Sequence, residues 1–169
     1  MQRVLIPSLL RSLPRSLSAS PRFRFPQSIP SSTFPNSFQK RAMSLSYVAT
    51  ENAPGAVGPY SQAIKAGNLV FVSGNIPLNP ATKKVEVQDI ESQAKQALAN
   101  LKAVVEASGS TVNKVVKTTV FLKDMNDFAA ANKVYAEFFG EHKPARSCVE
   151  VARLPLDVLF EIECIALLD

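Results

Sequence analysis

Histidine, cysteine and tryptophan are scarce in this chain of 169 residues, which holds one His, two Cys and no Trp. Disulfide frameworks are typical of shorter secreted chains with more cysteines, whereas Cys148 and Cys164 each lie in an apolar run. Zinc sites combine several Cys and His ligands, commonly in Cys-x-x-Cys pairs, and no such pair occurs here. The sequence therefore argues against a disulfide framework and against a metal site.

Acidic residues are absent from residues 1–43, which are rich in serine and proline and contain seven basic residues. An Arg-rich, Ser-rich and acid-poor start is typical of an organelle transit peptide, and Pro7, Arg11 and Pro14 interrupt the apolar run that a secretory signal needs. We expect residues 1–43 to direct the chain to the mitochondrial matrix and to be removed or disordered. A plastid destination, a basic arm that stays on the mature protein, and a cytoplasmic form started at Met43 are the alternatives.

Basic charge is also lacking in the remainder of the chain. The formal net charge of +5 falls to −2 for residues 44–169 once the seven N-terminal basic residues are removed. Nucleic-acid binding draws on a basic patch or stripe, and a membrane-spanning helix needs about 20 consecutive apolar residues, which no segment offers. We expect neither nucleic acid nor a membrane as a partner of this domain.

Residues 44–169 have the periodicity of one packed domain. A strand is predicted over residues 68–74, with residues 61–66 as its hairpin partner. Between Asp89, a plausible N-cap, and Gly109, which can end a helix, apolar residues recur at helical spacing. That apolar stripe consists of Ile90, Ala94, Ala97, Leu98, Leu101, Val104 and Val105.

The second half of the domain adds a β-branched strand over residues 115–122, expected to be central and buried on both faces. A second helix ends at Gly140, with Phe128, Ala131, Tyr135 and Phe138 as its expected apolar face. Two last strands, over residues 146–151 and 158–167, are joined by a short connection that predicts antiparallel neighbours. The order β-β-α-β-α-β-β predicts an α+β fold with both helices on one sheet face, so the other apolar face predicts oligomerisation.

Several segments then follow one another in a recognisable order. They are Ala53-Pro54, Gly58–Ala63, Val72–Pro77, Val116–Met125 and Pro144–Val151. Together they resemble the RidA (reactive intermediate deaminase A) family from about Tyr47 to the end of the chain. The resemblance implies a chorismate-mutase-like fold and a homotrimer whose sheets form a barrel, with active sites in the clefts between subunits.

The activity that this resemblance implies uses no cofactor. It is the hydrolysis of 2-aminoacrylate, 2-iminobutanoate and 2-iminopropanoate to the 2-keto acid and ammonia, which protects pyridoxal-phosphate enzymes and supports isoleucine biosynthesis. Two other functions stay open: a non-catalytic trimeric chaperone or regulatory module, and an RNA-directed translation inhibitor or endoribonuclease.

Two charged residues match the family's catalytic positions. Arg146 matches the arginine that binds the substrate carboxylate, for which a planar guanidinium suits better than an ammonium; a strand-end arginine paired with a surface acid is the alternative. Glu161 matches the glutamate that orients or activates water, with Glu163 as its rival. Strand parity permits these side chains to meet on one side if Cys148 lies opposite Glu161, and this register is a hypothesis.

Five further residues match substrate-binding positions. Tyr60 matches a tyrosine supplied by the neighbouring subunit, although it would also suit a half-buried aromatic side chain. Ser73 and Gly74 match one wall of the site, and Cys148 lines the pocket without an adjacent base to activate its thiol. Asn132 either reaches the site or belongs to a solvated helix face. The chain departs from the family at Phe160, where an aliphatic residue is common, and this change would reshape the pocket floor.

Overall fold

The computed structural model describes residues 45–168, so the expected transit peptide lies outside the described residues. Its strands and helices are β1 (Leu45–Val48), β2 (Ala63–Ala66), β3 (Leu69–Asn75), α1 (Ile90–Ala107), β4 (Val115–Leu122), α2 (Phe128–Phe139), β5 (Ala145–Glu150) and β6 (Phe160–Leu167). Neither helix has the length and apolar composition that crossing a membrane requires.

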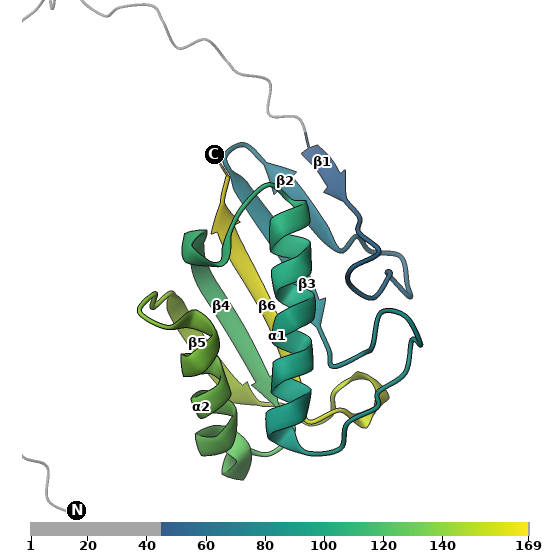
Figure 1. The fold of residues 1–169 in the computed structure, drawn as a ribbon, viewed down its shortest axis with the longest axis vertical. Helices are drawn as coiled ribbons and strands as arrows, with labels where there is room; N and C mark the ends of the chain where they lie inside the picture. Colours follow the sequence, from purple (N-terminus) through teal and green to yellow (C-terminus); the bar gives the residue numbers. More distant parts are fainter. Residues whose placement is uncertain (1–44, 169) are drawn as a thin grey trace, which may run out of the picture. The chain divides into compact units, whose positions relative to one another are not determined.

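The strands form one mixed sheet in the order β1-β2-β3-β6-β4-β5. All neighbouring strands are antiparallel except β4 and β5, which are parallel. Both helices lie on the same face of the sheet, with α1 across β3 and β6 and α2 toward the β5 edge (Figure 1). The α+β class and the one-sided helix layer are therefore confirmed. The sequence pattern missed β1, an edge strand in which three of the four residues are exposed and which has no apolar alternation to reveal it.

The uncovered sheet face carries the expected apolar side chains, but Glu161, Glu163 and Lys117 lie on it as well. Phe71 on β3 and Val149 on β5 expose 44% and 42% of their surface there, and Phe121 on β4 is only partly buried. Side chains of a strand alternate between the two faces, so Val120 and Leu122 lie under the helices while Phe121 points away. The expectation that β4 is buried on both faces is wrong for the single chain, because no element of residues 45–168 covers its second face.

Strands β5 and β6 are not neighbours, so the prediction from their short connection is wrong. The two strands run in opposite directions, but β4 lies between them and pairs with both. The connection passes across the end of β4, where Val151 donates to the carbonyl of Leu122 at 3.0 Å and Lys123 donates to the carbonyl of Leu159 at 3.1 Å. The short connection crosses the end of one strand, so β5 and β6 flank β4.

Helix α1 has the predicted ends, because the Asp89 carboxylate accepts a hydrogen bond from the Ser92 amide at 2.8 Å and Gly109 has a φ of 80°. Its buried face also carries two amides. Asn100 donates to the carbonyls of Ile76 and Leu78 at 3.0 and 2.9 Å. Gln93 donates to the carbonyl of Val87 at 3.0 Å and accepts from the amide of Leu159 at 2.7 Å. These bonds fix the exit of β3 and the entry of β6 to one rigid helix.

Helix α2 ends at Gly140, which has a φ of 57°. Its buried residues are Ala131, Val134, Tyr135 and Phe139. The predicted face was partly wrong, because Phe128 is 37% exposed and Phe138 is only partly buried. The helix packs against α1 as well as the sheet, so its buried stripe is rotated toward Val134 and Phe139.

Candidate active site

Arg146 lies on β5 and points toward helix α2. Its Nη1 donates to Oδ1 of Asn132 at 2.8 Å. The guanidinium carbon lies 4.5 Å from the centroid of the Tyr135 ring and 5.7 Å from that of Phe128, within the range of cation–π attraction. Asn132 therefore reaches the guanidinium and does not belong to a solvated helix face. One amide and two aromatic rings hold this cation in place.

No carboxylate of residues 45–168 forms an ion pair with Arg146. The ion pairs found there are Lys102–Glu106, Lys133–Glu91 and Arg153–Asp157. A guanidinium has five N–H donors, and the described residues engage one of them. The alternative of an arginine neutralised by a surface acid is not what the structure shows. The half-buried cation is instead open to an anion from outside the chain.

Tyr135 connects Arg146 to the neighbouring strand. Its hydroxyl shares a 2.8 Å hydrogen bond with the hydroxyl of Thr118, and both side chains are buried. Thr118 is the residue of β4 that pairs with Arg146. Burial raises the pKa of Tyr135, so the phenol stays neutral. The Tyr135 ring beneath the guanidinium is thus held by helix α2 on one side and by the hydrogen bond of its hydroxyl to Thr118 on the other.

Cys148 lies next to Arg146 on the same face of β5 and lines the same small pocket. Burial raises the pKa of its thiol, and the nearby charge of Arg146 offsets this rise only in part. A thiol needs a lowered pKa or an adjacent base to act as a nucleophile. The geometry therefore favours a lining role for Cys148, as the sequence analysis expected.

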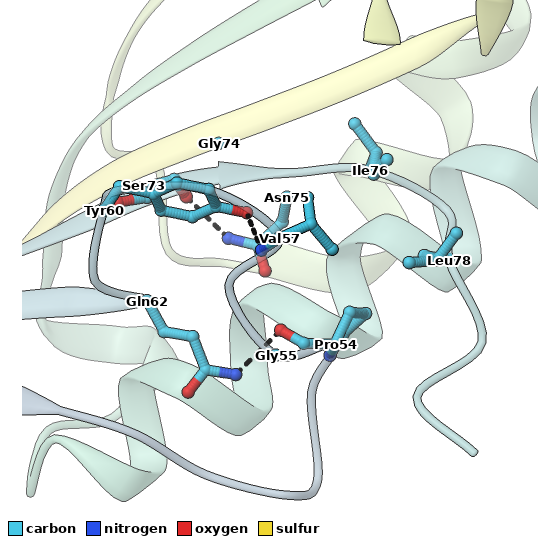
Figure 2. A pocket seen from close by; sticks show the side chains of 10 residues that line it. All are labelled: Pro54, Gly55, Val57, Tyr60, Gln62, Ser73, Gly74, Asn75, Ile76 and Leu78. Carbon is cyan, nitrogen blue, oxygen red and sulfur yellow. Dashed lines mark hydrogen bonds between the residues drawn. The ribbon is translucent and has the colours of Figure 1, made fainter. Parts of the chain in front are cut away.

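A second pocket lies at the C-terminal end of β3. Tyr60, Ser73 and Gly74 line it together with the loop at Pro54 and Gly55, as Figure 2 shows. The Ser73 hydroxyl donates to the carbonyl of Ser61 at 2.7 Å, so its proton is already engaged. Tyr60 is 49% exposed. This pocket thus gathers three of the residues that the resemblance assigned to the site.

Glu161 lies directly over Gly74. A Cβ atom built at Gly74 would overlap the Oε1 oxygen of Glu161 and lie 3.0 Å from its carboxyl carbon. The pairing of β3 with β6 shifts register between Val72 and Asn75, and such a bulge re-aims side chains locally. Burial raises the pKa of Glu161, and the neighbouring Glu163 raises it further. The carboxylate is thus held against main chain in a setting that makes it a better base.

Comparison with known proteins identifies the family of this chain. A family model described as Endoribonuclease L-PSP matches residues 50–168. The chain belongs to this family, the RidA/YjgF/L-PSP family. The RidA resemblance inferred from the motifs is therefore confirmed.

The match between this chain and its relatives spans nearly the whole length of each relative. A RutC family protein of Pyrococcus horikoshii is 60% identical over 119 residues, which is 70% of this chain and 94% of that protein. The 2-iminobutanoate/2-iminopropanoate deaminase of Escherichia coli is 58% identical over 122 residues, with the same coverage of 70% and 94%. The crystal structure of the YjgF gene product from E. coli superposes with a TM-score of 0.69 at 56% identity, covering 72% of this chain and 98% of that one.

The structure divides the expected site residues of this family member into two groups. Arg146 and Cys148 pair with Thr118 and Val120 of β4, on the helix-covered face. Glu161 and Glu163 belong to the opposite, uncovered face, because they pair with Phe121 and Thr119 of β4. The hypothesis that all four side chains meet on one side of the sheet is therefore wrong for a single chain. It assumed that β5 and β6 pair directly, and β4 separates them.

Two residues of the site were not singled out from the sequence. Tyr135 was assigned only to the apolar face of its helix, and nothing in the sequence pairs it with Thr118. Gln62 has a buried side chain whose Nε2 donates to the carbonyls of Thr50, Ala53 and Pro54 at 3.0, 3.3 and 2.8 Å, the last drawn in Figure 2. It thus holds the loop that borders Tyr60. Gln62 belongs to the motif Gly58–Ala63 that also contains Tyr60, and this position could have identified it as a site residue.

The buried pair of hydroxyls at Tyr135 and Thr118 should show strong energetic coupling. We expect Tyr135→Phe to destabilise the fold by about 1–2 kcal/mol, because it leaves the Thr118 hydroxyl buried without its partner. Adding Thr118→Val should recover part of that loss. Urea unfolding of the two single variants, the double variant and the unchanged protein gives the coupling energy. Strictly additive losses would show that the hydroxyls do not depend on each other.

A methyl group at Gly74 should displace the Glu161 carboxylate without unfolding the sheet, because the atoms it meets are the end of a flexible side chain. Gly55→Ala is the matched control, since no atom lies within 4 Å of a Cβ built there. Crystal structures of both variants test this prediction. An unmoved Glu161 carboxylate in Gly74→Ala would contradict the close packing described here.

Proposed function

We propose that this chain is an imine deaminase, active as a homotrimer, that hydrolyses small 2-imino acids to 2-keto acids and ammonia. Its 58% identity with the E. coli 2-iminobutanoate/2-iminopropanoate deaminase supports this activity. The site residues supply what the reaction needs: a cation for the substrate carboxylate and a carboxylate to activate water. Arg146 is the cation, and Glu161 is the base.

The observation that supports an active site shared between subunits is the separation of Arg146 from Glu161. Strand β4 lies between their strands, so two interstrand spacings, about 10 Å, separate β5 from β6. Their side chains also point to opposite faces of the sheet. One small imino acid cannot touch both groups in one chain. We infer that Arg146 of one subunit faces Glu161 of the next, and that the uncovered sheet face forms the interface.

The chemistry follows from that arrangement. Arg146 binds the substrate carboxylate and so orients the adjacent C=N carbon. Glu161 removes a proton from water, whose oxygen attacks this carbon while the imine nitrogen takes up a proton. The resulting tetrahedral carbinolamine collapses: its hydroxyl gives up a proton as the C=O bond of the keto acid forms, and the nitrogen gains a proton and leaves as ammonia when the C–N bond breaks. Holding the groups in place before the reaction is the main contribution of the protein.

The structure favours this activity over RNA cleavage. His142 is the one histidine of the sequence, and its Nε2 donates to the carbonyl of Val115 at 2.7 Å. The imidazole is therefore engaged in holding main chain. The domain also has a net charge of −2 over residues 44–169, whereas RNA binding draws on basic surface.

Replacing Arg146 should slow deamination strongly. We expect Arg146→Ala to lower kcat/KM tens- to thousands-fold, equivalent to about 2–5 kcal/mol, because an ionic hydrogen-bonded contact is lost. Ammonia release is measured from imines that an L-amino-acid oxidase generates in the assay, with the uncatalysed rate subtracted. Arg153→Ala is the matched control, since Arg153 is an exposed arginine paired with Asp157.

Size-exclusion chromatography with light scattering shows whether the trimer persists in both variants. An unchanged rate in Arg146→Ala would overturn the site assignment. The proposed function itself would be overturned if the unchanged protein did not deaminate imines but cleaved single-stranded RNA, and if Arg153→Ala retained that cleavage.

The two glutamates of β6 should respond differently to substitution. Glu161 must be ionised to act as a base, so kcat/KM should fall as pH drops through its raised pKa. Glu163 contributes to that raised pKa. Glu163→Gln should therefore shift the acid limb of the pH profile to lower pH while activity remains, and Glu161→Gln should abolish activity. Loss of activity in Glu163→Gln, with activity kept in Glu161→Gln, would make Glu163 the base instead.

A further inference from the structure

A small apolar cavity adjoins the guanidinium of Arg146. Apart from Arg146, Asn132 and Tyr135, its lining is apolar: Val120, Phe128, Ala131, Cys148 and Phe160. Phe160, Val120 and Ala131 expose no more than 4% of their surface, so they belong to the rigid core. Phe128 is 37% exposed and stands at the rim. The cavity thus has a fixed floor and an open side.

The free space in this cavity is small. It amounts to about 10 Å³, close to what one water-sized group occupies. Phe160 is the largest completely buried side chain among residues 45–168, and it lines this space. A smaller side chain at this position would deepen the cavity directly, because Val120 and Ala131 are held in place by the strand and helix that carry them.

The chemistry of the substrate brings its side chain to this cavity. In a 2-imino acid one carbon carries the carboxylate, the nitrogen and the side chain. When Arg146 holds the carboxylate, the side chain therefore begins within two bonds of the bound group, at the mouth of the cavity. This step rests on the proposed function.

We propose that Phe160 sets the upper limit on the substrate side chain. The free space takes about one water-sized group, so the terminal methyl group of a short side chain fills it. Longer and branched side chains meet the Phe160 ring. Phe160 and Glu161 are consecutive residues of β6 and point to opposite faces of the sheet. The strand that presents the base on one face therefore presents the size filter on the other, toward the Arg146 of the same chain.

A second cavity also borders Arg146 and offers the rival path for the side chain. It lies along the end of α2, where Phe139, His142 and Lys143 line it, and its free volume is about 390 Å³. A cavity of that volume would admit longer and branched side chains as well as short ones. Phe139 lines this wider cavity and not the small one, so the two paths can be separated by equivalent substitutions.

The test compares Phe160→Leu with Phe139→Leu, two identical changes at buried phenylalanines. Imines are generated by an L-amino-acid oxidase from alanine, 2-aminobutyrate, norvaline and leucine, and kcat/KM is measured for each. We expect Phe160→Leu to raise the ratio of kcat/KM for the norvaline-derived imine over the alanine-derived imine by about 10-fold or more, the size that one methylene commonly contributes in an apolar pocket. Phe139→Leu should leave this ratio unchanged.

Ala131→Val provides the opposite change, because it narrows the cavity without enlarging the core elsewhere. It should lower kcat/KM for the 2-aminobutyrate-derived imine more than for the alanine-derived one, and it tests the filter even if Phe160→Leu fails to fold. Thermal unfolding and light scattering check the fold and assembly of each variant.

An unchanged substrate profile in folded Phe160→Leu and Ala131→Val, with the unchanged protein active, would overturn the size filter and leave the deaminase proposal intact. A changed profile in Phe139→Leu alone would place the side chain in the wider cavity and also overturn it. Inactivity of the unchanged protein toward all four imines would instead count against the proposed function.

Discussion

The guanidinium of Arg146 is held by an amide oxygen and two aromatic rings, without a carboxylate among residues 45–168. Rings and amides fix the position of a cation without neutralising it. A half-buried charge of this kind favours an external anion, since removing the cation from water is only partly compensated. The polar chain from Thr118 through Tyr135 to Arg146 keeps that charge in one place, so binding need not first order the side chain.

The period of two along a β-strand decides how the rest of the site is distributed. Arg146 and Phe160 face the helices, while Glu161 faces the open side of the sheet. In the proposed mechanism, one sheet thus presents a carboxylate-binding half and a water-activating half to different neighbouring subunits. The proposed assembly covers this open face and brings both halves together, so the proposal makes catalysis depend on oligomerisation.

Buried amides give this arrangement its rigidity. Asn100 fixes the segment that leaves β3, and Gln93 fixes the segment that enters β6, each through two bonds to main chain. Gln62 does the same for the loop beside Tyr60. A buried amide left unpaired is costly, so each network specifies one loop conformation. Gly74 then allows the Glu161 carboxylate to approach the backbone, and any side chain at position 74 would push the carboxylate away.

Hydrophobic periodicity and capping residues determined the class of fold, because the stripe of α1, the Asp89 cap and the glycine stops are local signals. Motif order determined the family and nominated Arg146 and Glu161. Strand order, however, depends on pairing between distant segments, and only the tertiary structure showed that β4 separates β5 from β6. For the same reason the sequence could not reveal the Tyr135–Thr118 bond, the packing of Glu161 on Gly74, or the division of the site between two faces. Each of these arises from contacts across strands and helices, and a linear pattern carries no record of which segments become neighbours.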